Sequence, residues 1–288
     1  SQQVHMSIPK AIALLGIGRN NLRLIAVDGD FRMKPEDLAS AISDDRAMGL
    51  TPIAVVATVG TVVSGAIDPV PEIARIAKSE GLWLHVDGAY GALAALALPD
   101  VIPWLNLADS LSVDAHKWLY QPIECGCLLH KHQDVARATF SHTDDYVKVY
   151  SNDAVESFAF FEESLELSRR FRALKLWISL QYHGRRAFKK AIEDDLRHAQ
   201  SLAYLIQSRP ELELLAPVPL SAVCFRHRTK DNAAILRRVI ERRRVYLSNA
   251  TILGQFAMRA CFVNHRTTDD NVREVVSEIL AVVDELDG

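Results

Sequence analysis

The chain has 288 residues, which predicts about two domains, and its apolar content of 49% is typical of a folded protein with a sizeable core. Its net charge of −3 and pI of about 6.4 argue against a surface for nucleic acid or anionic lipid, and no apolar stretch is long enough to span a bilayer. Four cysteines without metal-ligand spacing indicate neither a metal site nor a disulfide framework, so we expect a soluble protein of the reducing cytoplasm.

The first half of the chain alternates short apolar runs with segments of helical spacing. One predicted helix ends near Gly16 and a second covers residues 35–48. A third begins after the expected N-cap Asp68 and stops at Gly81. The predicted strands cover residues 22–27, 52–57, 82–86, 110–113 and 126–130, the last as an antiparallel neighbour. This order predicts an α/β architecture with a mostly parallel sheet.

The second half begins with a segment, residues 138–163, in which the pattern gives way to polar and aromatic residues, as in a functional loop. A long helix then opens at Arg169. Further helices are predicted over residues 192–207, 231–243 and 270–286, and strands over 222–227 and 256–262. We therefore predict a larger domain over residues 1–180 and a smaller α/β domain over residues 181–288.

Asp87 and Lys117 each follow a predicted strand of the parallel sheet, at the edge where such sheets bind ligands. Pyridoxal phosphate needs a lysine for its Schiff base and a carboxylate beside its pyridine nitrogen. We expect Lys117 to be activated by burial without a counter-charge, and Gly88 and Ala89 to leave room for a flat ring. The simpler alternatives, a loop anchor for the aspartate and a solvated lysine, remain open on these residues alone.

Five segments carry a more specific signal when they are taken together and in order. They are His5, residues 57–61 (ATVGT), 85–90 (HVDGAY), 114–118 (DAHKW) and 169–175 (RRFRALK). With these segments the chain resembles the group II pyridoxal phosphate-dependent amino acid decarboxylases, whose members act on aromatic amino acids, tyrosine, histidine or glutamate. The resemblance covers essentially the whole chain. It implies a type I aminotransferase-like fold, a homodimer and a small-molecule amino acid substrate.

The resemblance also implies the residues that bind the cofactor, which are Lys117, Asp87, His5, Thr58, Ala89 and Asp114. Lys117 would attach the cofactor and Asp87 would pair with its pyridine nitrogen. His5 would stack on one face of the ring, Ala89 would touch the other, and Thr58 would lie at its edge. The family usually has Asn-Pro before His-Lys, and this asparagine helps to hold the phosphate. A carboxylate at Asp114 would repel a phosphate unless it is protonated or turned away.

The catalytic residues implied by the resemblance are Lys117, His116 and Tyr146. His116 would lie near the reacting centre, and Tyr146 matches the loop tyrosine that returns a proton to the substrate carbon. The family's N-terminal part, with much of the substrate pocket and the phosphate cup, would precede residue 1. The chain therefore resembles a C-terminal portion, for which a separate N-terminal segment or chain is a possible partner.

The function that we predict is decarboxylation of an L-amino acid, aromatic by resemblance, to an amine and carbon dioxide. Three alternatives stay open: a family member specific for glutamate or another amino acid, an aldehyde synthase, and an inactive fragment or pseudoenzyme. Aldehyde synthases of the family typically carry phenylalanine where Tyr146 stands. A nicotinamide-dependent dehydrogenase is disfavoured because Gly16-Ile-Gly18 lacks the third glycine and the preceding strand of the dinucleotide fingerprint.

Overall fold

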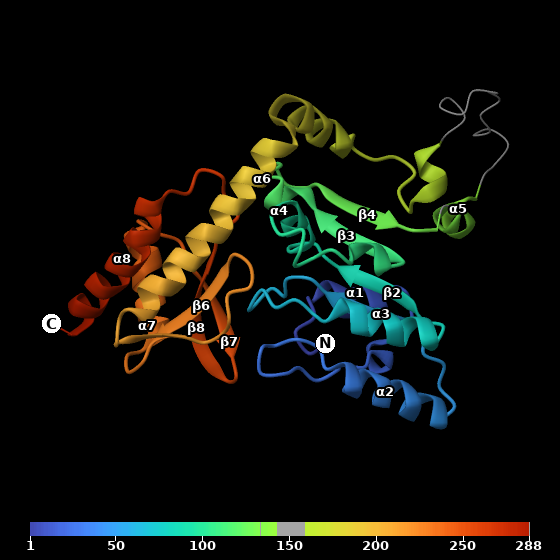
Figure 1. Ribbon diagram of the computed structural model, residues 1–288, viewed down its shortest axis with the longest axis horizontal. Helices are drawn as coiled ribbons and strands as arrows, with labels where there is room; N and C mark the ends of the chain where they lie inside the picture. The colour runs from blue at the N-terminus through green and yellow to red at the C-terminus, as the bar shows by residue number, and fades with distance from the viewer. Residues whose placement is uncertain (133, 143–158, 288) are drawn as a thin grey trace.

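Two four-stranded sheets lie at the centre of the molecule, and the long helix α6 (Arg172–Gln207) runs from one to the other (Figure 1). The computed structural model describes residues 1–132, 134–142 and 159–287. The sheets have strand orders β1-β2-β3-β4 and β5-β6-β8-β7. This α/β architecture, with a mostly parallel first sheet and a smaller C-terminal unit, agrees with the prediction. No helix within the described ranges is long and apolar enough to cross a membrane.

The first sheet consists of β1 (Ala54–Thr58), β2 (Trp83–Asp87), β3 (Ser110–Asp114) and β4 (Gly126–His130). The first three are parallel and β4 is antiparallel to β3, as the sequence predicted. The register pairs Thr58 with Asp87, and Asp87 with Ser112. The carboxyl ends of three strands therefore meet at one edge, the position where open α/β sheets bind ligands.

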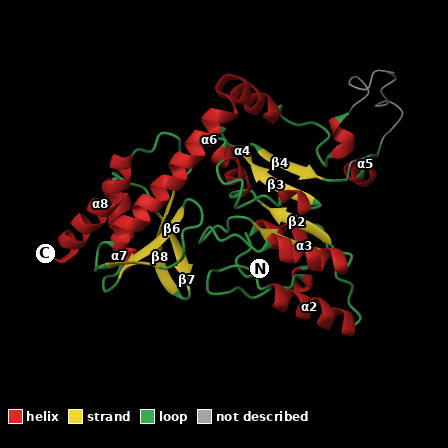
Figure 2. Ribbon diagram, in the orientation of Figure 1, coloured by secondary structure: helices red, strands yellow, loops and turns green. Residues whose placement is uncertain are grey.

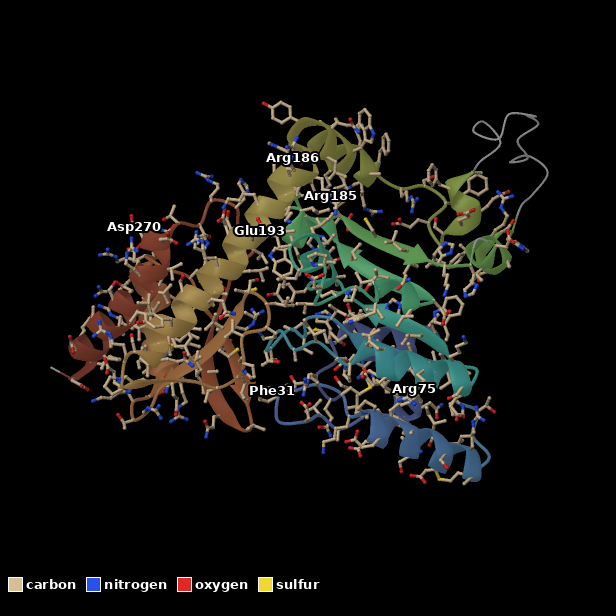
Figure 3. All side chains as sticks on the ribbon, viewed as in Figure 1. Phe31, Arg75, Arg185, Arg186, Glu193 and Asp270 are labelled. Carbon is tan, nitrogen blue, oxygen red and sulfur yellow. The ribbon has the colours of Figure 1, made fainter. Side chains whose placement is uncertain are left out.

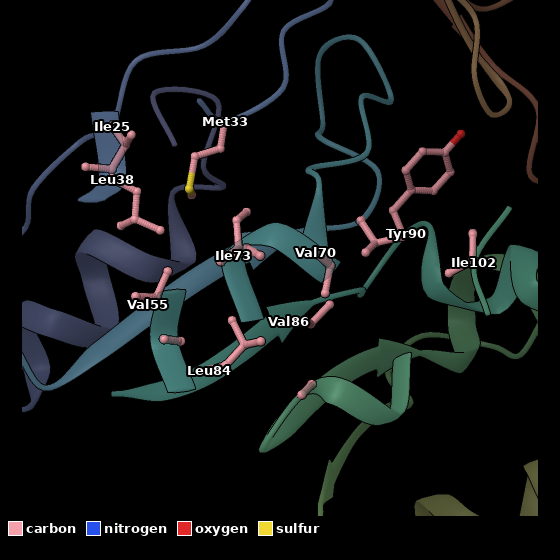
Figure 4. Packing of buried hydrophobic residues seen from close by; sticks show 14 of the residues in the cluster. Ile25, Met33, Leu38, Val55, Val70, Ile73, Leu84, Val86, Tyr90 and Ile102 are labelled. Carbon is pink, nitrogen blue, oxygen red and sulfur yellow. The ribbon is translucent and has the colours of Figure 1, made fainter. Parts of the chain in front are cut away.

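Three helices of the first half contribute buried residues beside this sheet: α2 (Pro35–Ala47), α3 (Val70–Ser79) and the short α4 (Ala115–Trp118). Helix α1 (Ser7–Leu14) buries none of its side chains. Helix α3 buries Val70, Ile73 and Ala77, spaced by three and four residues, against Leu84 and Val86 of β2 (Figure 4). Each large aliphatic side chain buried in this way contributes about 1.5–3 kcal/mol, so the packing fixes the strand ends that carry the polar residues.

The second sheet is antiparallel throughout and is covered by α6, α7 and α8 (Figure 2). Its strands are β5 (Leu212–Leu214), β6 (Ala222–His227), β7 (Ser248–Ile252) and β8 (Gln255–Cys261). Its helices are α7 (Asn232–Arg242) and α8 (Asp269–Asp287), and a further helix, α5 (Val135–Phe140), follows β4. The predicted boundary between residues 180 and 181 falls inside α6, so the division into domains stays a prediction.

The strand predicted over residues 22–27 is absent. The segment is extended, but its one ladder contact is an isolated bridge between Val27 and Met33. Ile25 is buried in the core, whereas Leu24 is more than half exposed. Apolar residues predicted a strand here, yet no neighbouring strand in the described part of the chain lies along the segment to pair with it.

Asp68 does not cap α3, contrary to the prediction. The helix begins at Val70 with Pro69 at its N-cap, and the Asp68 carboxylate accepts the backbone N–H groups of Met33 at 2.7 Å and Thr58 at 2.8 Å. These two amides are buried, and a buried N–H group without a partner is costly. Asp68 therefore joins the segment before α2 to the end of β1.

Candidate active site

The candidate site is built on Asp87, the last residue of β2. The Asp87 side chain is nearly buried, and its Oδ1 accepts hydrogen bonds from Ser112 Oγ and from the Ala89 backbone N–H, each at 3.2 Å. Ser112 is the register partner of Asp87 on β3. Two donors on one oxygen hold the carboxylate in a fixed direction.

Thr58 lies beside Asp87 because the two are register partners across β1 and β2. Its hydroxyl oxygen, Oγ1, is buried and has no hydrogen-bond partner among the residues that the structure describes. A buried hydroxyl without a partner is unfavourable, and such groups in native proteins call for an explanation such as a bound ligand. The orphaned hydroxyl next to a fixed carboxylate fits a polar ring, and the pair suits the cofactor that the sequence indicated.

Lys117 lies on α4, which follows β3 directly, and it faces Asp114 at the end of that strand. The Lys117 Nζ is 2.9 Å from Asp114 Oδ2, and the lysine side chain is 35% exposed. The prediction that Lys117 is buried without a counter-charge is therefore wrong. Lys117 lies at the predicted edge of the sheet, but its ammonium group is paired with the carboxylate of Asp114.

His116 contacts the same carboxylate. Its Nε2 is 3.5 Å from Asp114 Oδ2, and its Nδ1 accepts the backbone N–H of Cys125 at 3.2 Å. An accepting Nδ1 requires the proton of the neutral ring to be on Nε2, so the geometry assigns this tautomer. Asp114 therefore faces both a lysine and a histidine, and its Oδ2 is directed toward them.

Ala89 lies close to this group, because its carbonyl accepts the backbone N–H of Asp114 at 3.1 Å. Gly88 has a different role from the predicted one. A Cβ at Gly88 would lie 2.4 Å from the Ala92 Cβ and 2.9 Å from a Leu111 methyl carbon. Gly88 is therefore needed for close packing within the protein. The predicted reason for a glycine here, to leave room for a flat ring, was wrong.

Two of the predicted residues are not joined to this group. His5 is exposed at the start of α1, where its Nδ1 accepts the backbone N–H of Ser7 at 3.2 Å. No hydrogen bond or ion pair of the described residues connects it to the strand ends, so its stacking role stays a prediction. Tyr146 lies outside the described residues.

Ser112 was not among the predicted site residues, although its position on the strand gave a partial signal. Ser112 stands two residues before Asp114 on the same strand, and alternation along a strand places both on one face. In the structure the serine is opposite Asp87, whereas an alignment of β2 and β3 by their last residues would have placed Asp114 there. The strand register, which the sequence alone did not give, was the missing information.

A hollow of about 530 Å³ lies at the other end of the sheet and contains none of these residues. It is lined by Arg75 and Lys78 of α3, by Leu82 and Leu84 at the start of β2, and by Lys131; Figure 3 shows where Arg75 lies. Parallel strands present their ligand-binding edge at their carboxyl ends, so this hollow is not the candidate site.

Comparison with known proteins places these features in a family. The family model described as "Pyridoxal-dependent decarboxylase conserved domain" matches residues 1–228. An aromatic-L-amino-acid decarboxylase of Bacillus atrophaeus is 31% identical over 99% of this chain and 62% of its own length. A phenylacetaldehyde synthase of Arabidopsis thaliana is 30% identical over 95% of this chain and 59% of its own length.

Solved structures agree with these matches. Tryptophan decarboxylase of Catharanthus roseus in complex with L-tryptophan aligns with a TM-score of 0.88 and 31% identity, over 99% of this chain and 62% of that one. Oryza sativa TDC with PLP and tryptamine aligns with a TM-score of 0.91 and 27% identity, over 99% of this chain and 62% of that one. The chain spans about three fifths of the length of these relatives.

Proposed function

Because the chain belongs to the pyridoxal-dependent decarboxylase family, we propose that the protein binds pyridoxal phosphate and converts an L-amino acid to its amine and carbon dioxide. The observation that carries this proposal is the grouping of Asp87, Thr58 and Lys117 at adjoining strand ends. In the reaction the bond between Cα and the carboxylate breaks, carbon dioxide leaves, and a proton takes its place on Cα. Bound pyridoxal phosphate supplies the sink for the electron pair of the broken bond.

Asp87 would hold a proton on the pyridine nitrogen. A carboxylate fixed by Ser112 and the Ala89 N–H keeps its direction, which is what a partner for a protonated nitrogen requires. Thr58 Oγ1 would gain the hydrogen bond that it lacks. Both groups come from strands packed in the core, so the protein would orient the ring before any substrate binds.

Lys117 would bind the cofactor covalently through Nζ and would give it up to the substrate amine. Asp114 would take part by accepting a proton from Nζ, since its Oδ2 lies 2.9 Å away. A carboxylate turned toward the lysine is also turned toward His116, whose Nε2 carries the ring proton. We propose His116 and Tyr146 as the groups that deliver the proton to Cα, and His5 as the residue that covers the ring.

For the substrate we propose an aromatic L-amino acid, which the names of the relatives from Bacillus atrophaeus and Catharanthus roseus support. An aldehyde synthase is the second candidate, because phenylacetaldehyde synthases from Arabidopsis thaliana and Petunia hybrida are 30% and 29% identical to this chain. Tyr146 favours decarboxylation in the choice between the two. We also propose a homodimer that works in the cytoplasm, where the four free cysteines would stay reduced.

The test combines a visible spectrum with a product analysis. Pyridoxal phosphate added to the purified protein should give the visible absorbance of a lysine-bound cofactor, and Lys117→Ala should abolish it. Lys131→Ala, which removes an exposed lysine at the far edge of the same sheet, serves as the control. The amine screen covers tyrosine, tryptophan, dihydroxyphenylalanine, histidine and glutamate. An absorbance that persists in Lys117→Ala refutes the assignment, and an aldehyde in place of the amine establishes the second candidate.

A further inference from the structure

A buried carboxylate lies behind the lysine helix, on an element far away in the sequence. Asp195 belongs to α6 and is 1% exposed. Its Oδ2 accepts the hydroxyl of Tyr120 at 2.8 Å, and the backbone N–H of Asn264 also donates to this carboxylate. Tyr120 follows α4, whereas Asn264 follows β8 of the second sheet. Asp195 therefore joins three segments at the junction of the two sheets.

Two of the residues beside Asp195, Trp118 and Tyr120, lie close to Lys117 in the chain. The Tyr120 backbone N–H donates to the Lys117 carbonyl at 3.1 Å. Trp118 is fully buried against Tyr90, with ring centroids 4.9 Å apart. Its buried indole N–H has no hydrogen-bond partner within the described part of the chain, and the proximity of this donor to Asp195 acts to lower the pKa of that carboxyl.

Helix α4 cannot hold Lys117 in place by itself. It has four residues, and a single helical turn has little stability without tertiary contacts. It is followed by Tyr120 at a φ of 52°, a left-handed conformation that is unfavourable for a residue with a side chain. An anchor on the Tyr120 side chain offsets this cost, and α4 packs against α6 at this point.

The charge state of the cluster suits such an anchor. Burial raises the pKa of Asp195 to about 6, so the carboxylate is ionised at neutral pH and accepts hydrogen bonds. Burial and the nearby Asp195 raise the pKa of Tyr120 far above its usual value, which keeps the phenol protonated as a donor. The His265 ring also faces the cluster, with its centroid 5.2 Å from that of Tyr120. Asp194, the next charged group on α6, acts on the cluster only through its charge, because its carboxylate is paired with Lys190.

We propose that Asp195 is a positioning residue that sets the place of Lys117 by holding Tyr120 and Trp118 on α6. It touches neither the reacting atoms nor the cofactor. The proposal rests on the proposed function for the role of Lys117, but the anchoring of residues 115–121 by Asp195 is a property of the protein alone. It also links the second sheet, through Asn264, to the lysine.

The test uses Asp195→Ala and Tyr120→Phe, alone and combined, with Asp194→Ala as the matched control. Asp194 is the neighbouring residue on α6 and pairs with Lys190 at the surface. Hydrogen exchange of the cofactor-free protein, read by mass spectrometry, should speed up about tenfold in residues 115–121 for either variant, the effect of one lost buried hydrogen bond. Exchange in α2 should keep its wild-type rate, and the double variant should match Asp195→Ala. The control should behave as wild type.

The second readout is the capture of pyridoxal phosphate, followed by visible circular dichroism. Both variants should slow capture about fivefold or more and change the sign or size of the visible band, because the lysine no longer meets the ring in one orientation. Tyr120→Phe loses one hydroxyl and keeps its ring, so it tests the proposal even if Asp195→Ala does not fold. If residues 115–121 of this variant exchange at the wild-type rate, the proposal is overturned. Absence of a band in the wild type would refute the proposed function, and the exchange data would still decide on Asp195.

Discussion

The buried carboxylate of Asp195 makes a quantitative prediction about stability and pH. The pKa of this group is raised from 3.8 to about 6 by burial, so the folded state binds the proton more tightly than the unfolded state. Its contribution to stability is therefore present at low pH and is lost as the pH rises from 3.8 to about 6. The full change is about 3 kcal/mol at 1.36 kcal/mol per pKa unit, of which about 2 kcal/mol falls between pH 4.5 and pH 7.5.

The assay is urea unfolding of the wild type and of Asp195→Asn at several pH values across this range. As the pH rises, the free energy of unfolding of the wild type should fall by about 2 kcal/mol relative to that of the variant. Asp194→Asn provides a control whose difference from the wild type should stay constant across this range. The pKa of Asp194 is lowered from 3.8 by its hydrogen bond to Lys190, so its contribution to stability is complete above about pH 4.5 and is lost only as the pH falls below 3.8. A difference for Asp195→Asn that is constant with pH would refute the reasoning.

Three further predictions concern the residues around Asp87. Asp87→Asn should lower the rate of amine formation about a hundredfold with little change in unfolding free energy, since it removes a fixed charge; a near-normal rate would contradict its role. Gly88→Ala should destabilise the protein by about 1–3 kcal/mol in urea unfolding, because its Cβ would overlap Ala92, and wild-type stability would show that the backbone adjusts easily. Tyr90→Phe should lower the free energy of unfolding by about 1–3 kcal/mol in the same assay. The Tyr90 hydroxyl lies 2.7 Å from Ser221 Oγ and accepts the Ser221 N–H at 2.9 Å, so its removal leaves both groups without this partner. An unchanged midpoint would mean that water replaces the hydroxyl.

The strands of the first sheet could be predicted because each is a short apolar run that ends at a glycine or a polar residue. Asp87 and Lys117 come at the ends of two of these runs. Parallel pairing of the two strands was therefore enough to predict that both residues lie at the same edge of the sheet. The segment at residues 22–27 has the same composition, yet it forms no strand. Pairing depends on a neighbour in space, which a local pattern does not contain.

The partners of the charged groups could not be predicted. Asp114 replaces an asparagine that helps to hold the phosphate in the family, and its carboxylate faces Lys117 and His116, two partners that the sequence did not indicate. Asp68 has the sequence position of a helix cap, but its carboxylate accepts hydrogen bonds from the backbone N–H groups of two other segments. Asp195 lies 75 residues beyond Tyr120 and appeared only as part of a helix. A carboxylate binds whichever donors the fold brings to it, and long-range packing decides which these are.

The central claim, that Lys117 binds the cofactor, can be tested most directly by reductive trapping. The protein would be incubated with pyridoxal phosphate, reduced with borohydride, digested and mapped by mass spectrometry. The account predicts the added cofactor mass on the peptide that contains Lys117, with little on Lys131 or Lys175, and none on that peptide in Lys117→Ala. Equal labelling of the exposed lysines, with no preference for Lys117, would contradict it.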